Sequence, residues 1–228
     1  LPRALPNIPG VEIATHYQTS QWAGGDYYDF FELPNGRWGF LIADVSGHGT
    51  PAAVMMAILH SLAHGHPGDP EPASSLLEHV NRRLSARYTT SNEVFVTAFY
   101  AIYDPATREL AYSCAGHNPP QLRRCSLGEV ETLEEVGGPP LGVFENMEYA
   151  QARMTLREGD ILVLYTDGVT EAMDERHRQF GLDQLNVVLS QCHLSAAAMR
   201  DAILEAVDRF TSGRSAHDDR TLLVVKVS

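Results

Sequence analysis

The sequence predicts an α+β fold, a stacked two-sheet antiparallel β-sandwich flanked by helices in an α-β-β-α arrangement. Three observations point to it. Strand-like segments dominate the chain, several are joined by hairpin turns, and helical periodicity is confined to two early and two late segments. Helices grouped in this way between antiparallel strands are typical of sheets that pack together with helices outside.

The first strands form a predicted hairpin. Residues 11–15 alternate apolar and polar side chains, as a half-buried strand does. Residues 27–33 are rich in aromatic side chains, which favour strands, and residues 38–45 return. The Pro-Asn-Gly sequence between them indicates a turn, because proline presets φ and Asn-Gly tolerates positive φ.

Two helices are predicted next. Thr50 is a candidate N-cap with Pro51 at the first helical position. Residues 52–64 are apolar nearly all round, which indicates a helix buried on more than one side. After a loop rich in proline and glycine, a second helix is expected to begin at Ser74 or Ser75 and to end near residue 88.

The remaining elements follow from periodicity and from glycine and proline breaks. Strands are predicted at residues 95–103, 109–115, 121–124, 130–133, 149–156, 161–166 and 221–227, with helices at 181–191 and 195–210. No internal repeat or long linker divides the chain, so residues 1–228 are expected to form a single domain. The chain begins with Leu1 instead of Met, and we expect it to be a domain excised from a longer regulatory protein.

Composition excludes several classes of function. The formal net charge is -12, from 29 acidic and 17 basic residues, which argues against binding to nucleic acid or to an anionic membrane surface. The three cysteines are widely spaced and odd in number, so neither a disulfide nor a zinc site is expected, and a reducing, cytoplasmic compartment is favoured. No apolar run is long enough to span a membrane, and no signal peptide is expected.

Acidic residues recur where strands meet glycine-rich turns. Asp26 follows two glycines, Asp44 and Asp167 lie at strand ends, and Asp218 and Asp219 precede the last strand. Each position alone is compatible with ordinary turn chemistry. Together they suggest a metal site, because carboxylates near a sheet core need a partner and the only lysine is Lys226. Oxygen ligands suit Mg²⁺ or Mn²⁺, and two such ions about 3.5–4 Å apart can activate water and clamp a phosphoryl group.

With these residues the chain resembles the protein phosphatase 2C superfamily of metal-dependent Ser/Thr phosphatases, and more narrowly its bacterial SpoIIE/RsbU branch. The resemblance covers residues 8–227. The matching segments, in the family's order, are Gly24-Gly25-Asp26-Tyr27-Tyr28-Asp29, Ala43-Asp44-Val45-Ser46-Gly47-His48-Gly49 with Pro51-Ala52-Ala53, Ala115-Gly116-His117-Asn118-Pro119-Pro120, Thr166-Asp167-Gly168-Val169-Thr170-Glu171 and Asp218-Asp219-Arg220-Thr221.

The resemblance implies a site for two Mn²⁺ or Mg²⁺ ions between the sheets. Asp44 matches the bridging carboxylate and the Val45 carbonyl an adjacent ligand, while Asp26 matches an acidic residue near the first ion. Asp167 and Asp218 match ligands of the second ion. Asp219 is either a further ligand or a group that supports one.

The implied activity is a protein-serine/threonine phosphatase, in which Asp26, Asp44, Asp167 and Asp218 are the catalytic carboxylates and a metal-activated water attacks the phosphorus directly. The implied substrate is a phosphorylated anti-sigma-factor antagonist or a similar bacterial regulator. Two alternatives stay open: a catalytically silent binding module of this fold, and a hydrolase of small phosphoesters.

Several residues carry weaker signals. His48 stands where many relatives have lysine, and we interpret it as a tolerated loop residue. His117 is expected to be structural, His217 to lie in an exposed loop, and Cys114 to be a buried packing residue. No arginine near Asp26 matches the phosphate-binding arginine of eukaryotic relatives. By resemblance, the helices near 52–64 and 74–88 could regulate the site and form a homodimer; plain core packing is the alternative.

Overall fold

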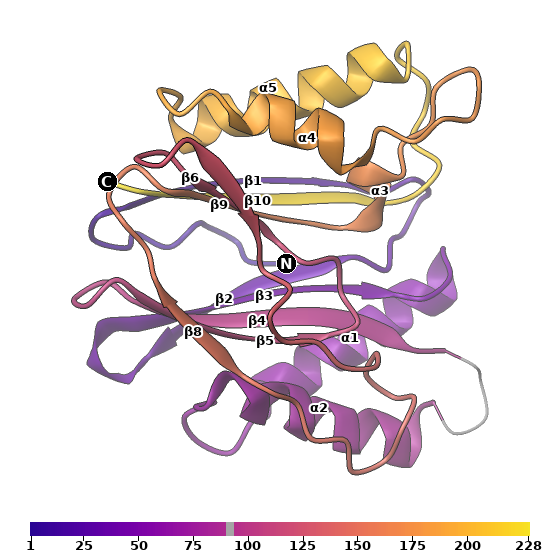
Figure 1. The fold of residues 1–228 in the computed structure, drawn as a ribbon. Coiled ribbons are helices and arrows are strands. Elements are labelled where there is room, and N and C mark those ends of the chain that lie inside the picture. The colour runs from indigo at the N-terminus through magenta and orange to yellow at the C-terminus, as the bar shows by residue number, and fades with distance from the viewer. Residues whose placement is uncertain (90–93) are drawn as a thin grey trace. The chain divides into compact units, whose positions relative to one another are not determined.

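The computed structural model describes residues 1–89 and 94–228, and the chain divides into two compact units. Unit 1 contains the described residues of Leu1–Arg3, Gln21–Asn118 and Glu134–Thr155. Unit 2 contains Ala4–Ser20, Pro119–Leu133 and Leu156–Ser228. Each unit is built around its own antiparallel sheet (Figure 1).

The sheet of unit 1 has five strands in the order β2-β3-β4-β5-β8. Helices α1 and α2 pack on one of its faces, α1 against β3 and α2 against β4 and β5 (Figure 1). The elements are β2 (Tyr27–Leu33), the 3-10 turn η1 (Pro34–Gly36), β3 (Arg37–Val45), α1 (Thr50–His64), α2 (Ala73–Arg87), β4 (Val96–Asp104), β5 (Glu109–Ala115) and β8 (Ala152–Thr155).

The predicted hairpin is confirmed. Strands β2 and β3 pair from Tyr27 opposite Ala43 to Leu33 opposite Arg37. The turn between them needs positive φ, which Asn35 (63°) and Gly36 (72°) supply. The apolar side chains of α1 and α2 are buried against this sheet, among them Leu59 and Leu76.

The sheet of unit 2 also has five strands, in the order β1-β10-β9-β6-β7. Helix α5 packs against β1 and β10, and α4 packs beside α5 (Figure 1). The elements are β1 (Val11–Gln18), β6 (Gln121–Arg124), β7 (Glu129–Thr132), β9 (Ile161–Tyr165), α3 (Asp167–Thr170), α4 (Gly181–Leu189), α5 (Ala196–Phe210) and β10 (Arg220–Val227). The helical spacing of Met199, Ile203 and Val207 buries one face of α5.

Two antiparallel sheets, each with its own helices, confirm the predicted α+β class. The predicted strand at 149–156 is shorter, because only Ala152–Thr155 belongs to β8. Gln151 instead accepts a hydrogen bond from the backbone N–H of Ala73, and the Tyr149 hydroxyl donates to the Pro139 carbonyl over 3.0 Å. The prediction of Thr50 as the N-cap of α1 is wrong: Thr50 is the first helical residue, and the N-cap is Gly49, whose φ of 74° is a conformation that glycine adopts readily.

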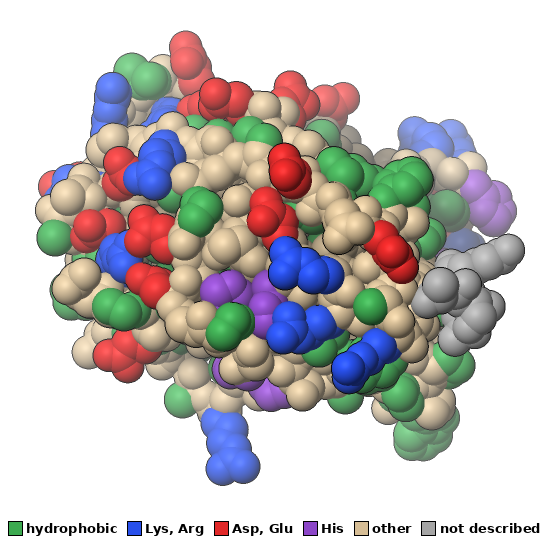
Figure 2. Space-filling model, turned by 90° about the horizontal axis from the view of Figure 1, so that it is seen from below, with side chains coloured by type: hydrophobic (Ala, Val, Ile, Leu, Met, Phe, Trp, Pro, Cys, Tyr) green, Lys and Arg blue, Asp and Glu red, His purple; other side chains and the backbone are tan. Residues whose placement is uncertain are grey.

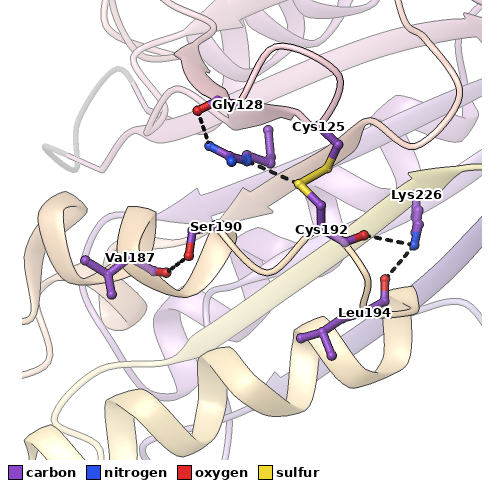
Figure 3. The surroundings of a disulfide bond; sticks show 8 residues. Cys125, Gly128, Val187, Ser190, Cys192, Leu194 and Lys226 are labelled. Carbon is purple, nitrogen blue, oxygen red and sulfur yellow. Dashed lines mark hydrogen bonds between the residues drawn. A yellow bond between two sulfur atoms is a disulfide. The ribbon is translucent and has the colours of Figure 1, made fainter.

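The absence of a disulfide, predicted from cysteine spacing, is wrong. Cys125, after β6, is bonded to Cys192, after α4, across 67 residues of sequence (Figure 3). Nearby, the Lys226 ammonium donates to the backbone carbonyls of Cys192, over 3.3 Å, and Leu194, over 2.7 Å. The fold brings the two cysteines together, so their spacing in the sequence could not predict the bond. With this disulfide present, the cysteines no longer favour a reducing compartment.

None of the helices in the described residues combines the length and the apolar character that a membrane span requires.

Candidate metal centre

The first acidic group lies at one end of the β2–β3 pair in unit 1. Asp26 directly precedes β2 at Tyr27, Tyr27 pairs with Ala43 of β3, and Asp44 directly follows Ala43, so the two aspartates lie at the same end of the strand pair. Asp26 is 1% exposed and Asp44 is half-buried. Asp44 also pairs with Thr97 of β4, whose hydroxyl donates to the Asp44 carbonyl over 3.5 Å.

Glycine allows the backbone to approach closely at this end of the sheet. A Cβ on Gly25 would lie 3.0 Å from the Val45 carbonyl oxygen and 3.1 Å from the Ala52 Cβ. The loop after Val45 is tied to the start of β4, because the Ser46 N–H donates to Phe95 O and the Phe95 N–H donates to Ser46 Oγ, each over 2.9 Å. The segment that carries Asp44 and Val45 is therefore held on both sides.

The second acidic group lies in unit 2, where β9 ends and β10 begins. Thr166 and Thr221 join these strand ends, since the Thr166 N–H donates to the Thr221 carbonyl and the Thr221 N–H to the Thr166 hydroxyl. Asp167 follows directly, as the first residue of α3. Asp218 and Asp219 precede β10, so the structure brings these three acidic residues together.

Gly168 makes this arrangement possible. A Cβ at this position would lie 2.0 Å from the carbonyl oxygen of Asp219, well inside any tolerable contact. The side chain of Asp219 turns to Ser20, accepting hydrogen bonds from its N–H at 2.7 Å and its hydroxyl at 3.2 Å. Asp218 is exposed and accepts a hydrogen bond from the Asp219 N–H at 2.8 Å.

The charges in this group repel one another. Burial, followed by the charges of Asp218 and Glu171, raises the pKa of Asp167 to about 6. The neighbouring Arg220 is directed to Asp208, at 3.3 Å. Within the described residues, neither Asp167 nor Asp218 forms an ion pair with lysine or arginine.

This donor set fits a divalent cation. All its side-chain ligand atoms are carboxylate oxygens, and a bound cation would relieve their mutual repulsion, since in the described residues Asp167 and Asp218 pair with no lysine or arginine. Hard oxygen donors of this kind suit Mg²⁺ and Mn²⁺.

The histidines near the motifs and Cys114 differ in burial and in their contacts. His48 is exposed, and its Nδ1 lies 3.1 Å from the Gln21 amide nitrogen. His117 is buried with its Nδ1 2.8 Å from the Thr97 hydroxyl, which supports a structural role. Cys114 is buried, as predicted, and burial raises the pKa of its thiol. His217 is exposed, as expected.

Sequence reasoning missed two supporting residues, Ser20 and Thr97. Each holds an acidic residue through a hydrogen bond between distant parts of the chain. Neither belongs to a motif that could have indicated it. A pocket beside the second acidic group is likewise formed by separate segments, with Glu171, Met173, His217, Asp218 and Arg220 among its lining residues.

Three comparisons with known proteins show what this chain is similar to. Residues 34–228 match the family described as Stage II sporulation protein E (SpoIIE). Phosphoserine phosphatase RsbP of Bacillus subtilis is 28% identical over 219 residues, which are 95% of this chain and 52% of RsbP. A structure of the RsbU and RsbW domains of a Mycobacterium tuberculosis protein aligns with a TM-score of 0.80 at 25% identity, over 97% of this chain and 61% of that one.

The fold is that of the protein phosphatase 2C class. The PP2C domain of SpoIIE from Bacillus subtilis aligns with a TM-score of 0.79 at 22% identity, over 95% of this chain and 63% of that one. More narrowly, the chain belongs to the SpoIIE family, in the SpoIIE/RsbU branch, so the resemblance noted from its motifs is confirmed. The chain spans about half the length of the curated relatives it matches.

Proposed function

We propose that the chain is a metal-dependent phosphoserine/phosphothreonine protein phosphatase. The observation that carries this proposal is the second acidic group, in which Asp167 has its pKa raised to about 6 and has no basic partner among the described residues. An arrangement that destabilises its own charges is typical of a functional site. The name of RsbP, a phosphoserine phosphatase, supports the substrate class.

The proposed ligands expected from the motifs are Asp26, Asp44, the Val45 carbonyl, Asp167 and Asp218, and Asp219 is either a further ligand or a group that supports one. Two ions, Mn²⁺ or Mg²⁺, are proposed. When bound, such ions would neutralise phosphate charge and lower the pKa of water. The hydrogen bonds from Ser20 to Asp219 favour a role in which Asp219 positions the loop before β10.

The chain's own carboxylates would hold the cations at fixed positions, against which the substrate phosphate would be oriented. The anchored loop after Val45 and the close backbone packing at Gly168 keep the carboxylates at fixed positions within each unit. Fixed donors need little reorganisation during reaction, which lowers the barrier for direct displacement at phosphorus. Buried Cys114 is not suited to act as a nucleophile, which agrees with a mechanism without a phosphoenzyme.

As substrate we propose a phosphorylated bacterial regulator of the anti-sigma-factor antagonist type. We propose further that residues 1–228 act as one catalytic domain, and that α1 and α2 take part in regulation or in a homodimer. A cytoplasmic location is proposed because a regulator of transcription acts there. The Cys125–Cys192 disulfide weighs against that location, since stable disulfides are rare in reducing compartments.

The test is hydrolysis of p-nitrophenyl phosphate and of a phosphoserine peptide with Mn²⁺, with Mg²⁺ and with EDTA. We expect turnover that needs the metal and falls at least about 100-fold in Asp167→Asn, because one carboxylate ligand is lost. Asp183→Asn, at an exposed position in the first turn of α4, is the matched control and should keep full activity. Metal binding without turnover on either substrate would instead support a catalytically silent module.

A further inference from the structure

Two histidines on α1 meet a buried aspartate on β2. His60 and His64 are one helical turn apart, and their ring centroids are separated by 4.4 Å. His64 Nε2 lies 2.7 Å from Asp29 Oδ2, and His60 Nδ1 lies 3.5 Å from the same oxygen. In this cluster, Asp29–His60–His64, one ligand atom from each residue lies within 4.8 Å of the other two.

The surroundings hold the three side chains in place. Asp29 is 6% exposed, and its other oxygen accepts the Phe30 N–H at 2.8 Å. The Tyr27 hydroxyl lies 2.5 Å from Asp29 Oδ2 and 2.8 Å from His60 Nδ1. On the other side, the Phe31 ring packs on His64 with centroids 4.9 Å apart. The carboxylate is therefore buried and oriented, while the two imidazoles reach it from the half-exposed surface of α1.

Histidine side chains gather on the face seen in Figure 2, close to lysine or arginine side chains. A second histidine pair, His66 and His79, has ring centroids 4.8 Å apart. In that pair, His79 Nδ1 lies 2.9 Å from an Arg83 guanidinium nitrogen, which would repel a cation. His60 and His64 face the Asp29 carboxylate instead. Of the two histidine pairs, only this one therefore has a neighbouring charge that attracts a cation.

We propose that Asp29, His60 and His64 bind one divalent transition-metal ion of the Zn²⁺ type. Tetrahedral Zn²⁺ has ligand bonds of about 2.0–2.2 Å, so its ligand atoms are about 3.4 Å apart. The 3.5 Å between His60 and Asp29 matches this spacing, and the 2.7 Å between His64 and Asp29 needs only a small rotation of an exposed side chain. Three protein ligands would leave the fourth position to water.

Tyr27 completes the proposed site as a positioning residue. Its hydroxyl donates to Asp29 Oδ2, the kind of outer contact that orients a ligand and raises affinity. When the ion binds, the 2.8 Å contact between this hydroxyl and His60 Nδ1 would be replaced by the bond from the nitrogen to the metal. A hydrated ion could reach the cluster from a pocket on the surface of unit 1, lined in part by Phe31, Leu33, His64 and His66.

This site differs in chemistry from the carboxylate groups described above. Two imidazole donors favour Zn²⁺ and its neighbours over Mg²⁺, which prefers oxygen ligands. The site also stands independently of the proposed phosphatase activity. Its bound ion would join α1 to β2, three residues after Asp26, and would brace that helix against the strand.

The test uses the full 228-residue chain, purified without a polyhistidine tag and kept in excess Mg²⁺ so that oxygen-rich sites are occupied. Co²⁺ is titrated and its visible absorption is followed, and Zn²⁺ is then added as competitor. We expect one Co²⁺ per chain with the strong absorption of a tetrahedral site, displaced by one equivalent of Zn²⁺. Absence of Co²⁺ absorption and of Zn²⁺ binding by calorimetry would overturn the proposal and leave Asp29 and His64 as a hydrogen-bonded pair only.

Variants locate the ion. His60→Ala and His64→Ala should each weaken Co²⁺ binding at least about 100-fold, since each removes a direct ligand. Their side chains are 48% and 45% exposed, so neither change empties the core. His66→Ala is the matched control on the same face and should bind Co²⁺ normally. Equal affinity in His64→Ala and wild type, or an equal loss in His66→Ala, would show that the ion binds elsewhere.

Discussion

At Asp167, burial and the neighbouring carboxylates raise the pKa from 3.8 to about 6. The folded chain therefore holds this proton more tightly than the unfolded chain does. Without metal, the contribution of Asp167 to the free energy of unfolding is greatest below about pH 4, falls as the pH rises to about 6, and is constant above. The full difference is about 3 kcal/mol, which partial exposure of the carboxyl reduces to about 1 kcal/mol.

Asp167→Asn removes this pH-dependent contribution to the free energy of unfolding. In EDTA at pH 7 we expect the variant to be more stable than wild type by about 1 kcal/mol, with the difference shrinking towards pH 4. Urea denaturation at a series of pH values measures it. A constant difference between the two proteins across this range would contradict the raised pKa.

Gly168 is the second residue at which a single change has a clear consequence. Gly168→Ala would place a Cβ 2.0 Å from the backbone oxygen of Asp219, where no flexible side chain can move aside. We expect a loss of at least about 2 kcal/mol in the free energy of unfolding, because the loop before β10 must shift. Gly137→Ala is the control, since nothing lies within 4 Å of its added Cβ. Equal stability of the two variants in urea would contradict the predicted clash.

At the scale of elements, the Cys125–Cys192 bond ties the β6–β7 turn to the segment between α4 and α5 (Figure 3). A cross-link across 67 residues restricts the unfolded chain and contributes about 4 kcal/mol in the loop-entropy treatment. We expect reductant, or Cys192→Ser, to lower the free energy of unfolding by up to about this amount. Denaturant melts with and without reductant measure it.

Cys125→Ser/Cys192→Ser is the control and should not respond to reductant. A thiol titration of the denatured, unreduced chain should detect one thiol, that of Cys114. Detection of all three thiols would mean that the bond does not form in the isolated chain.

At the scale of the whole molecule, bound metal should stabilise the folded chain. The formal net charge of -12 and the acidic groups of both units favour cation binding. Mg²⁺ at 100 times its Kd should add about 2.7 kcal/mol to the free energy of unfolding and raise Tm accordingly. The effect should weaken below about pH 6, where protons compete for Asp167.

Thermal melts with Mg²⁺ and with EDTA measure this stabilisation. Asp167→Asn should lose most of it, and Asp183→Asn should retain it. If Asp167→Asn gained as much stability from Mg²⁺ as wild type does, Asp167 would not be a ligand.

The α+β class, most strand positions and the motifs of the SpoIIE family could all be predicted from the residues alone. These features depend on local preferences, such as positive φ at Asn35 and Gly36 or the apolar face of α5, which neighbouring residues encode. The sequence also pointed to Asp26, Asp44, Asp167 and Asp218 as candidate ligands, because each adjoins a recognisable break in a strand, and their role as ligands stays a prediction.

Features that depend on contacts between distant segments could not be predicted from the sequence and became visible in the folded chain. The Cys125–Cys192 bond, the hydrogen bonds from Ser20 to Asp219, and the approach of His60 and His64 to Asp29 are of this kind. No local spacing encodes them, because strand register and helix packing bring these residues together, and both are set by burying the apolar faces of whole elements.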